Sequence, residues 1–487
     1  MTETDPTLRG ISEIRAFFRT NQTPIYFISP TAFNLLGIDR WVRNFFYVNR
    51  FDSFEGRHPR VFVPKDRPYR EFSSMEDICN YLLRNKEVIA YVRAKGQGGK
   101  AVFVMFDEET EALAAEAQLG VAHPSAELRH RLDSKIVTTQ LANEAGVPSA
   151  PNTLGRATTY DELLALAHSE GLGDDLVVQT PYGDSGKTTF FIRGQRGWDQ
   201  DAADMVDQEL KVMKRINCRA AAVEAALTRH GTVVGPLMTD LTGYPELTPH
   251  RGGWCGNDIW PEALSAEHRE RARVFTQKLG DRLAIEGYRG FLEIDYLANI
   301  DTGELYLGEL NPRISGVTSM TNVTAGAYAD IPLFLFHLLE YLDVEYELDV
   351  DEINARWAKA SSVDVWSQLV LKETRDRTEQ LTQAPQTGIW RLDDETGRVS
   401  LSRWGNDWHS LHDEAEAFYL RVLGPGDYRY PGADLGVLIT RSRMQTEDNQ
   451  LTERAHRWID SIQQHFAGTP LAEDAAVPAS ALAFKTA

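Results

Sequence analysis

The chain contains little cysteine, and this scarcity excludes two kinds of architecture. Of its 487 residues only three are cysteines, at positions 79, 218 and 255. They are far apart, odd in number and without the CxxC spacing of zinc ligands. Neither a disulfide framework nor a structural zinc site is therefore expected. Free cysteines fit a reducing compartment, so we expect the protein to be cytoplasmic.

Long apolar runs and an excess of positive charge are also missing. No stretch approaches the ~20 apolar residues that cross a bilayer. The first residues, MTETDPTLRG, carry acidic groups where a secretory signal carries basic ones. The 71 acidic against 51 basic residues give a net charge of −20, and nucleic-acid binding needs a basic surface. We therefore expect neither nucleic acid nor a membrane as a partner.

Short β-rich runs alternate with helical patterns over the first 340 residues, which is typical of α/β folds. The first part, up to about residue 125, is expected to be an open-sheet α/β domain. Its expected strands are Ile25–Ile28, Val61–Val63, Val88–Val92 and Ala101–Met105, and its expected helices are Met75–Arg84 and Thr110–Ala117.

A capped helix and a glycine-rich hairpin come next. Asp133 is the expected N-cap of a helix over Ser134–Glu144. Strands at Leu176–Gln179 and Thr189–Ile192 flank the loop TPYGDSGK and predict a β-hairpin. A P-loop is not expected, because GxxxxGK[ST] needs glycine where Pro181 stands.

A second hairpin carries acidic residues. The long helix Ser265–Glu286, for which Ser265 is the expected N-cap, precedes strands at Phe291–Ala298 and Leu305–Leu310. The residues NIDTG between the two strands contain a turn signal. A helix is expected at Ile331–Leu342 after them.

The two strands of this hairpin predict a magnesium site. Because alternate side chains of a strand share a face, Glu293 lies beside Asp295, and Glu309 beside Asn311. Pairing of the strands would bring these oxygen ligands together, as Mg²⁺ requires. Arg313, two residues further, would present a planar fork of donors to a phosphate or a developing carboxyl oxygen.

The strand IDYL and the following ELNPR, with the capped helix and glycine loop before them, resemble the ATP-grasp superfamily over about residues 130–340. Members of that superfamily join a carboxylate to an amine, or to another nucleophile, through an acyl phosphate. The resemblance implies an α/β (α+β) ATP-grasp fold with an N-terminal open-sheet domain and a C-terminal mixed α+β domain. It also implies ATP and Mg²⁺ as cofactors. The metal ligands carried over are Asp295, Glu309 and Asn311, and the catalytic residues are Arg313 and Lys187. The ATP-binding residues carried over are Lys135, Gln179, Gly183, Ser185, Gly186, Lys187, Lys214, Ile216 and Glu224.

The chain departs from the family pattern at two places. The strand before the glycine loop usually ends in lysine, where Gln179 stands here, and Lys187 would supply the missing charge from the other end of the loop. The adenine linker usually opens with glutamate, whereas KVMKRI offers Met213 and Lys214. Between these elements, TPHRGGWCGND with His250, Trp254 and Asn257 is either an acceptor-facing stretch, as in the family, or an ordinary surface loop.

The resemblance implies an ATP-dependent ligase that joins a carboxylate to an amine, with small-molecule acid and amine substrates. A biotin carboxylase is the alternative within the fold, because GADLGVLIT and the residues after it are similar to the end of that branch. The Glu-His pair of that branch is missing after NPR. A nucleotide-binding regulator without turnover is the alternative of another class, and a homodimer is one option for the assembly.

The resemblance and the changes of composition divide the chain into five parts. They are an N-terminal α/β domain (1–125), two ATP-grasp subdomains (126–205 and 206–345), a C-terminal α+β domain (346–468) and a flexible tail (469–487).

Overall fold

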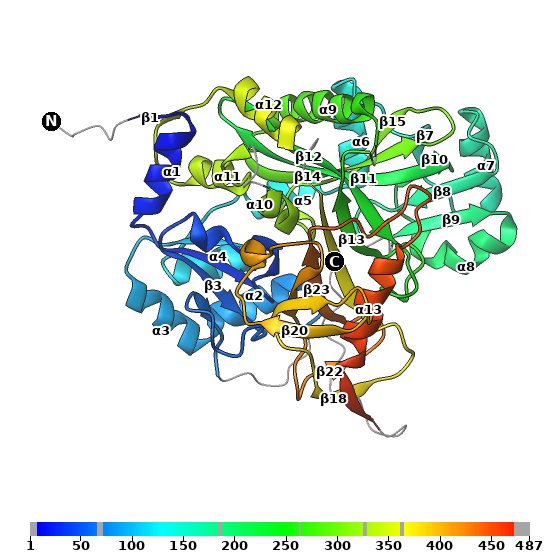
Figure 1. The fold of residues 1–487 in the computed structure, drawn as a ribbon. Coiled ribbons are helices and arrows are strands. Elements are labelled where there is room, and N and C mark those ends of the chain that lie inside the picture. The colour runs from blue at the N-terminus through cyan, green and yellow to red at the C-terminus, as the bar shows by residue number, and fades with distance from the viewer. Residues whose placement is uncertain are drawn as a thin grey trace.

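The first region of the chain forms a parallel five-stranded sheet in the order β4-β3-β2-β5-β6, drawn in blue in Figure 1. The computed structural model describes residues 7–65, 72–183, 188–262, 264–324, 329–360 and 365–471. The strands of this sheet are β2 (Ile25–Ser29), β3 (Phe45–Asn49), β4 (Val61–Phe62), β5 (Lys100–Val102) and β6 (Gly120–Val121). The helices of the region are α1 (Gly10–Thr20), η1 (Phe33–Leu35), η2 (Ile38–Arg40), α2 (Met75–Arg84), α3 (Lys86–Lys95), α4 (Glu108–Glu116) and α5 (Ala126–Leu132). Every residue of β2 and β3 is buried, as a parallel sheet covered on both faces requires.

The predicted strand at Val88–Val92 is wrong, because these residues lie within the helix α3. The side chain of Asn85 accepts the N–H groups of Glu87 and Val88 and so begins the helix. Val88 and Val92, four residues apart, are the two positions that α3 buries. The β-branched composition suggested a strand, but capping and helical spacing decided the structure. The helix predicted at Met75–Arg84 is confirmed.

The glycine-rich hairpin belongs to a separate four-stranded sheet in the order β7-β10-β8-β9. Its strands are β7 (Asn152–Gly155), β8 (Asp175–Gln179), β9 (Thr189–Arg193) and β10 (Leu210–Lys214), and its helices are α6 (Lys135–Glu144), α7 (Tyr160–Ser169) and α8 (Gln195–Met205). β8 and β9 pair antiparallel, which confirms the predicted hairpin. The N-cap of α6 is Ser134, whose hydroxyl accepts the N–H of Val137. Asp133, the predicted cap, instead ends α5 in a right-handed helical conformation.

The acidic hairpin lies at one edge of an antiparallel ten-stranded sheet, in the order β15-β14-β11-β12-β13-β17-β23-β21-β19-β20. Its strands are β11 (Cys218–Thr228), β12 (Gly231–Thr242), β13 (Trp254–Ile259), β14 (Gly290–Asn299), β15 (Leu305–Asn311), β17 (Trp366–Lys372), β19 (Gly388–Leu392), β20 (Val399–Arg403), β21 (Glu416–Arg421) and β23 (Asp434–Thr440). The helices that accompany it are α9 (Ala266–Ile285), α10 (Thr318–Thr324), α11 (Phe334–Tyr341) and α12 (Val350–Ala360). Ser265 caps α9, as predicted. Because β13 pairs with β17, the C-terminal region shares its sheet with the preceding subdomain.

Two small sheets and a few further elements complete the described structure. They are β1 (Leu8–Arg9) with β16 (Tyr346–Glu347), the sheet of β18 (Glu379–Gln383), β22 (Tyr428–Arg429) and β24 (Ala467–Pro470), the 3₁₀ helix η4 (Trp408–Ser410) and the helix α13 (Glu453–Gln464). Of the expected tail, Thr469 and Pro470 belong to β24, and residues 472–487 lie outside the described residues. Within the described ranges, no helix combines the length and the apolar character that a membrane span needs.

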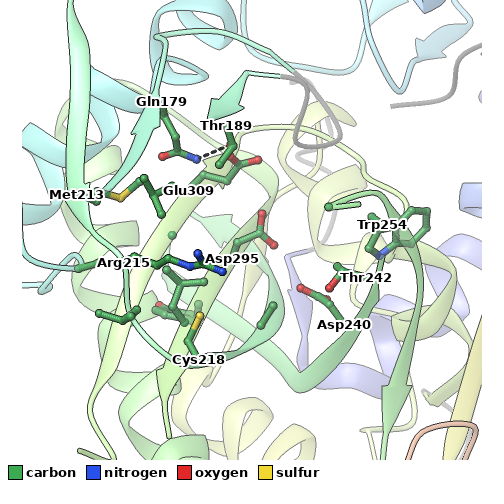
Figure 2. Close-up of a pocket in the computed structure, with 18 of the residues that line it drawn as sticks. Gln179, Thr189, Met213, Arg215, Cys218, Asp240, Thr242, Trp254, Asp295 and Glu309 are labelled. Carbon is green, nitrogen blue, oxygen red and sulfur yellow. Dashed lines mark hydrogen bonds between the residues drawn. The ribbon is translucent and has the colours of Figure 1, made fainter. Parts of the chain in front are cut away.

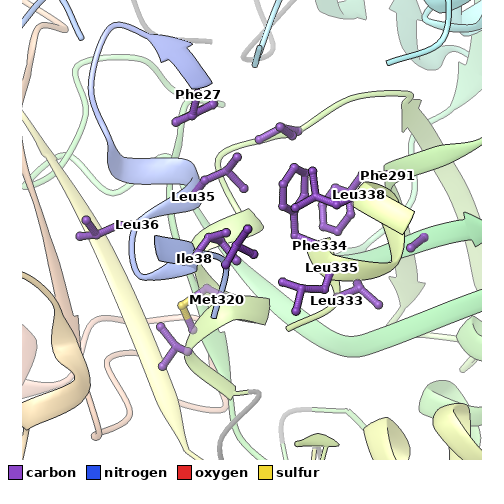
Figure 3. Packing of buried hydrophobic residues seen from close by; sticks show 14 of the residues in the cluster. Phe27, Leu35, Leu36, Ile38, Phe291, Met320, Leu333, Phe334, Leu335 and Leu338 are labelled. Carbon is purple, nitrogen blue, oxygen red and sulfur yellow. The ribbon is translucent and has the colours of Figure 1, made fainter. Parts of the chain in front are cut away.

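One apolar cluster joins the first region to the ten-stranded sheet. Figure 3 shows Phe27 and Leu35 of the first region packed on the same cluster as Phe291 and Phe334. All four are almost completely buried. Truncating one such side chain, as in Phe334→Ala, is expected to cost about 3–5 kcal/mol. The cluster therefore fixes the first region against the sheet that carries the acidic hairpin.

Candidate active site

A cavity of about 880 Å³ lies between the four-stranded sheet and the acidic hairpin (Figure 2). At one end it is lined by the strands and linker expected to hold adenine, and its middle is lined by the predicted metal ligands. The far end, on the other side of Asp295 from Gln179, is lined by Asp240, Thr242 and Trp254 (Figure 2), and the lining of the cavity also includes Arg313, Ser315, Gly316 and Val317. The strand pairing thus brings together most of the residues that the sequence singled out.

The register of β14 on β15 produces the predicted acidic cluster. Asp295 pairs with Glu309, and Glu293 with Asn311, so the four side chains stand together on one face. The next pair is Tyr296 with Leu307, which leaves Gly308 as the extra residue of a β-bulge. Such a bulge bends the strand and re-aims the side chain beside it.

A chain of hydrogen bonds connects Arg313 to this cluster. Its Nη2 donates to Oδ1 of Asn311 at 2.9 Å, and Nδ2 of Asn311 donates to Oδ2 of Asp295 at 3.4 Å. Arg313 and Asn311 are each only 7% exposed. The guanidinium is therefore held in a fixed direction beside the cavity.

Lys135 connects the acidic hairpin to the glycine loop. Its Nζ lies 3.2 Å from Oε2 of Glu309 and donates to the carbonyl of Gly183 at 2.9 Å. Its backbone N–H donates to the carbonyl of Pro181, also at 2.9 Å. Lys135 is the first residue of α6, so the positive end of that helix points at the same place.

Lys211 is a site residue that sequence reasoning missed. It lies on β10, directly paired with Gln179 of β8, and only 1% of it is exposed. Its Nζ donates to the carbonyl of Gly308, the residue of the bulge, at 3.1 Å. Burial lowers the pKa of Lys211 to about 8, although the nearby Glu309 carboxylate acts in the opposite direction. A lysine thus stands one strand away from the position where Gln179 breaks the family pattern.

Gln179 lies at the edge of the cavity, where its Nε2 donates to Oγ1 of Thr189 at 3.1 Å (Figure 2). Its Oε1 is buried and has no hydrogen-bond partner among the residues that the structure describes. Turning the amide over would let the Thr189 hydroxyl donate to Oε1, and Nε2 would then take the buried position that Oε1 now holds.

The linker after β10 forms the end of the cavity that is expected to hold adenine, opposite to Asp240 and Trp254. The N–H of Lys214 donates to Pro151 O at 2.9 Å, and the N–H of Arg215 donates to Asp175 O at 3.0 Å. Both lie with Ile216 in the lining, beside the apolar side chain of Val177. These bonds hold the linker in an extended form against the four-stranded sheet.

Glu224 does not reach this cavity. Its carboxylate is fully buried and accepts from the hydroxyls of Thr321 at 2.7 Å and Ser315 at 3.4 Å, and also from that of Thr318. Burial raises the pKa of Glu224 to about 8, while the hydroxyl donors act in the opposite direction. These contacts anchor α10, and the predicted role in ATP binding remains a prediction. Ser185, Gly186 and Lys187 lie outside the described residues.

The electrostatics of the cluster favour a bound cation. Burial, followed by the carboxylates of Glu293 and Glu309, raises the pKa of Asp295 well above its ordinary value. Among the described residues, no three His, Cys, Asp or Glu side chains form a metal site of their own. Two carboxylates and the Asn311 amide suit Mg²⁺ when phosphate oxygens and waters complete the coordination. The donor set therefore fits the ion that the sequence predicts.

Comparison with solved structures finds the same fold across most of the chain. The biotin carboxylase domain of 2-oxoglutarate carboxylase from Hydrogenobacter thermophilus, determined with MgADP, ADP and bicarbonate, is 12% identical with a TM-score of 0.57, and covers 92% of this chain and 90% of its own. Phosphoribosylamine–glycine ligase from Thermotoga maritima is 10% identical with a TM-score of 0.55, and covers 92% and 97%. N5-carboxyaminoimidazole synthase from Aspergillus clavatus, with ADP and 5-aminoimidazole ribonucleotide, is 12% identical with a TM-score of 0.52, and covers 86% and 94%. Neither a family model nor a curated protein matches the chain.

The chain therefore has the ATP-grasp fold, with a parallel N-terminal sheet and antiparallel sheets after it, as the sequence predicted. The similar structures include both a carboxylase domain and an amine ligase, so the fold leaves the reaction open.

Proposed function

We propose that the chain is an ATP-dependent ligase that activates a carboxylate as an acyl phosphate and joins it to an amine. The observation that carries this proposal is the position of Lys135. One ammonium group contacts both the glycine loop, at Gly183, and the acidic hairpin, at Glu309. An ATP whose phosphates lie at that group would have the glycine loop on one side and the metal ligands on the other.

The cavity can take ATP along its length. In the proposed pose the linker binds adenine through the carbonyl of Lys214 and the N–H of Ile216, because the N–H groups of Lys214 and Arg215 are already bonded. The residues proposed at the phosphates are Lys135, Gln179, Gly183, Ser185, Gly186 and Lys187. Asp295, Glu309 and Asn311 would hold Mg²⁺, which neutralises charge on the β- and γ-phosphate oxygens when bound.

The proposed reaction has two steps. A carboxylate oxygen attacks the γ-phosphorus in line, the bond to the β-phosphate oxygen breaks, and ADP leaves with that bonding pair. The amine nitrogen then attacks the acyl carbon, the carbon–oxygen bond to phosphate breaks, and the nitrogen loses a proton as the amide forms. Arg313, held by Asn311, is placed to stabilise the oxyanion of the second step.

A trapping experiment tests this proposal without the natural acceptor. The full chain is incubated with MgATP, a panel of carboxylic acids and hydroxylamine, which converts an acyl phosphate to a hydroxamate. We expect one class of acid to give hydroxamate and ADP in equal amounts, and only with magnesium. Formation of ADP without hydroxamate for every acid would contradict the acyl phosphate.

Carboxylation is the second candidate, because the fold also matches a biotin carboxylase domain determined with bicarbonate. ADP release that needs bicarbonate and biotin, and no other acid, would favour it. Tight binding of MgATP without any ADP release would instead favour a regulator.

A further inference from the structure

The far end of the cavity carries a carboxylate that none of the predicted roles uses. Asp240 lies on β12 and lines the same cavity as Asp295 and Arg313. Figure 2 shows Asp240 with Thr242 and Trp254 on the side of the cavity opposite to Gln179, with Asp295 between the two groups. Asp295 thus lies between Asp240 and Gln179.

Hydrogen bonds from two other strands fix the direction of Asp240. Asn257, its partner on β13, donates from Nδ2 to Oδ1 of Asp240 at 2.6 Å. Oδ1 of Asn257 in turn accepts from Nε1 of Trp254 at 3.0 Å and from Nε2 of Gln368 at 3.1 Å. An indole nitrogen can only donate, so the Asn257 amide must point its NH₂ group toward Asp240.

The surroundings of Asp240 make its negative charge costly without a neighbouring cation. Burial, and then the Glu293 carboxylate, raise the pKa of Asp240 well above its ordinary value. A magnesium ion on Asp295 and Glu309 would be coordinated by phosphate oxygens, which would offset its charge, so Asp240 would still need a cation of its own. A ligand that brings its own positive charge would be favoured beside the carboxylate of Asp240.

A small apolar cavity of about 60 Å³ adjoins this end. Trp254, Arg313 and Gly316 line both cavities, and the remaining walls combine apolar side chains, such as Phe33 and Val370, with the polar Asn34 and Asp434. The volume is about twice the ~30 Å³ that one water occupies in the liquid. It therefore suits a short apolar substituent and not a large group.

We propose that Asp240 binds the ammonium group of the acceptor, a small primary amine with a short apolar substituent, and that its carboxylate takes one proton from this group, so that the nitrogen has a free electron pair when it attacks. This inference rests on the proposed function and adds the chemical class of one substrate. Asn257, Trp254 and Gln368 are positioning residues, because they act on the acceptor through Asp240.

Binding of simple probes tests the inference. Full-length chain loaded with MgADP is titrated calorimetrically with methylammonium to butylammonium, with the alcohols of equal size, and with bicarbonate. We expect at least one of the amines to bind the wild type about 10- to 100-fold more tightly than its alcohol, the range of a hydrogen bond to a charged group. Asp240→Asn keeps the size of the side chain and should lose that preference, with MgADP affinity unchanged.

Asp258→Asn provides the matched control. Asp258 lies on the neighbouring strand, is fully buried, and accepts the N–H of Gln445 at 2.9 Å outside the cavity lining. This variant also removes one buried carboxylate, but it should keep the preference for amines. Thermal unfolding of both variants shows whether each is folded.

Several results would overturn the assignment. They are the absence of amine binding to the wild type, equal binding of amine and alcohol, or unchanged amine binding to Asp240→Asn. A loss of MgADP affinity in Asp240→Asn would instead make Asp240 a metal ligand. Hydroxamate trapping is independent of these titrations, so amine binding without hydroxamate would reject the acyl phosphate and retain the amine site.

Discussion

Two hairpins face each other across the cavity, and they are built differently. The acidic hairpin β14–β15 is enclosed: β14 pairs with β11, and the outer edge of β15 is covered where Leu307 donates to the carbonyl of Pro148 at 2.8 Å. The glycine-rich hairpin β8–β9 ends its sheet at β9, where Phe191 is 46% exposed. Ligands that bind a metal need fixed positions, whereas a loop that surrounds a nucleotide needs an accessible edge.

Two lysines connect these different halves. Lys135 reaches from α6 to Glu309, and Lys211 reaches from β10 to the bulge at Gly308. Both lysines lie in the region of the four-stranded sheet, and both ammonium groups contact β15. Of the two hairpins, the acidic one is thus fixed, and the four-stranded sheet that carries the glycine-rich hairpin is positioned on it through the two ammonium groups. Variants that remove the Lys135–Glu309 ion pair or the Lys211–Gly308 hydrogen bond should show how much each contact contributes to the position of the four-stranded sheet.

The largest effect is expected from the acidic hairpin itself. Glu309→Gln removes a proposed metal ligand and the ion-pair partner of Lys135, so magnesium-dependent ADP formation should fall about 10³-fold, several kcal/mol of lost charge stabilisation. Steady-state ADP release measures this. Glu304→Gln, at the exposed tip of the same hairpin, is the control and should leave the rate unchanged. Full activity of Glu309→Gln would remove this hairpin from the chemistry.

Arg313→Lys should have the next largest effect. Lysine keeps the charge but loses the planar fork that is bonded to Asn311. We expect kcat to fall about 10²-fold, the usual effect of losing an oxyanion donor, with MgADP affinity unchanged. Arg271→Lys, on the exposed side of α9, is the control for the substitution type. A fall in MgADP affinity equal to the fall in kcat would place Arg313 at the phosphates instead.

An effect of intermediate size is expected from the cross-strand pair of Lys211 and Gln179. Lys211→Met leaves the carbonyl of Gly308 without its donor and should raise KM for ATP about 10-fold, as expected for a hydrogen bond from a charged group. Exchanging the two residues in the double variant Gln179→Lys, Lys211→Gln restores a lysine to the other strand of the pair. We expect the exchange to recover most of the lost affinity. A double variant weaker than Lys211→Met would show that the two positions are not equivalent.

The sequence predicted the two hairpins well because each depends on local signals. Alternation in β14 and β15 and the turn between them placed Asp295 beside Glu309, as the register confirms. Lys211 and Asp240 could not be found in this way. Lys211 meets Gln179 through a strand pairing across 32 residues of chain and Gly308 through a side-chain hydrogen bond across 97 residues, and packing sets both contacts.

The C-terminal region shows the same limit on a larger scale. Its composition predicted a separate mixed α+β domain, and both helices and strands are present there. The pairing of Asn257 with Gln368, which joins it to the central sheet, leaves no local signal in either segment. That pairing also supplies the hydrogen bond that orients Asn257 toward Asp240. The far end of the cavity was therefore beyond reach of the sequence, although Trp254 and Asn257 had been singled out near it.

The smallest expected effect compares two helix caps. Ser134 caps α6, and its neighbour Lys135 lies at the glycine loop, whereas Ser265 caps α9, whose first turn is outside the cavity lining. Ser134→Ala and Ser265→Ala should each lower the free energy of unfolding by about 1 kcal/mol, because each leaves an N–H of the first turn without its acceptor. Only Ser134→Ala should also weaken MgADP binding, by a few-fold, since fraying of α6 displaces the Lys135 ammonium from Gly183. Chemical denaturation together with nucleotide titration measures both quantities. If Ser134→Ala and Ser265→Ala change nucleotide affinity equally, the position of the Lys135 ammonium group does not depend on the N-cap of α6. The contact between the two hairpins would then be provided by Lys211.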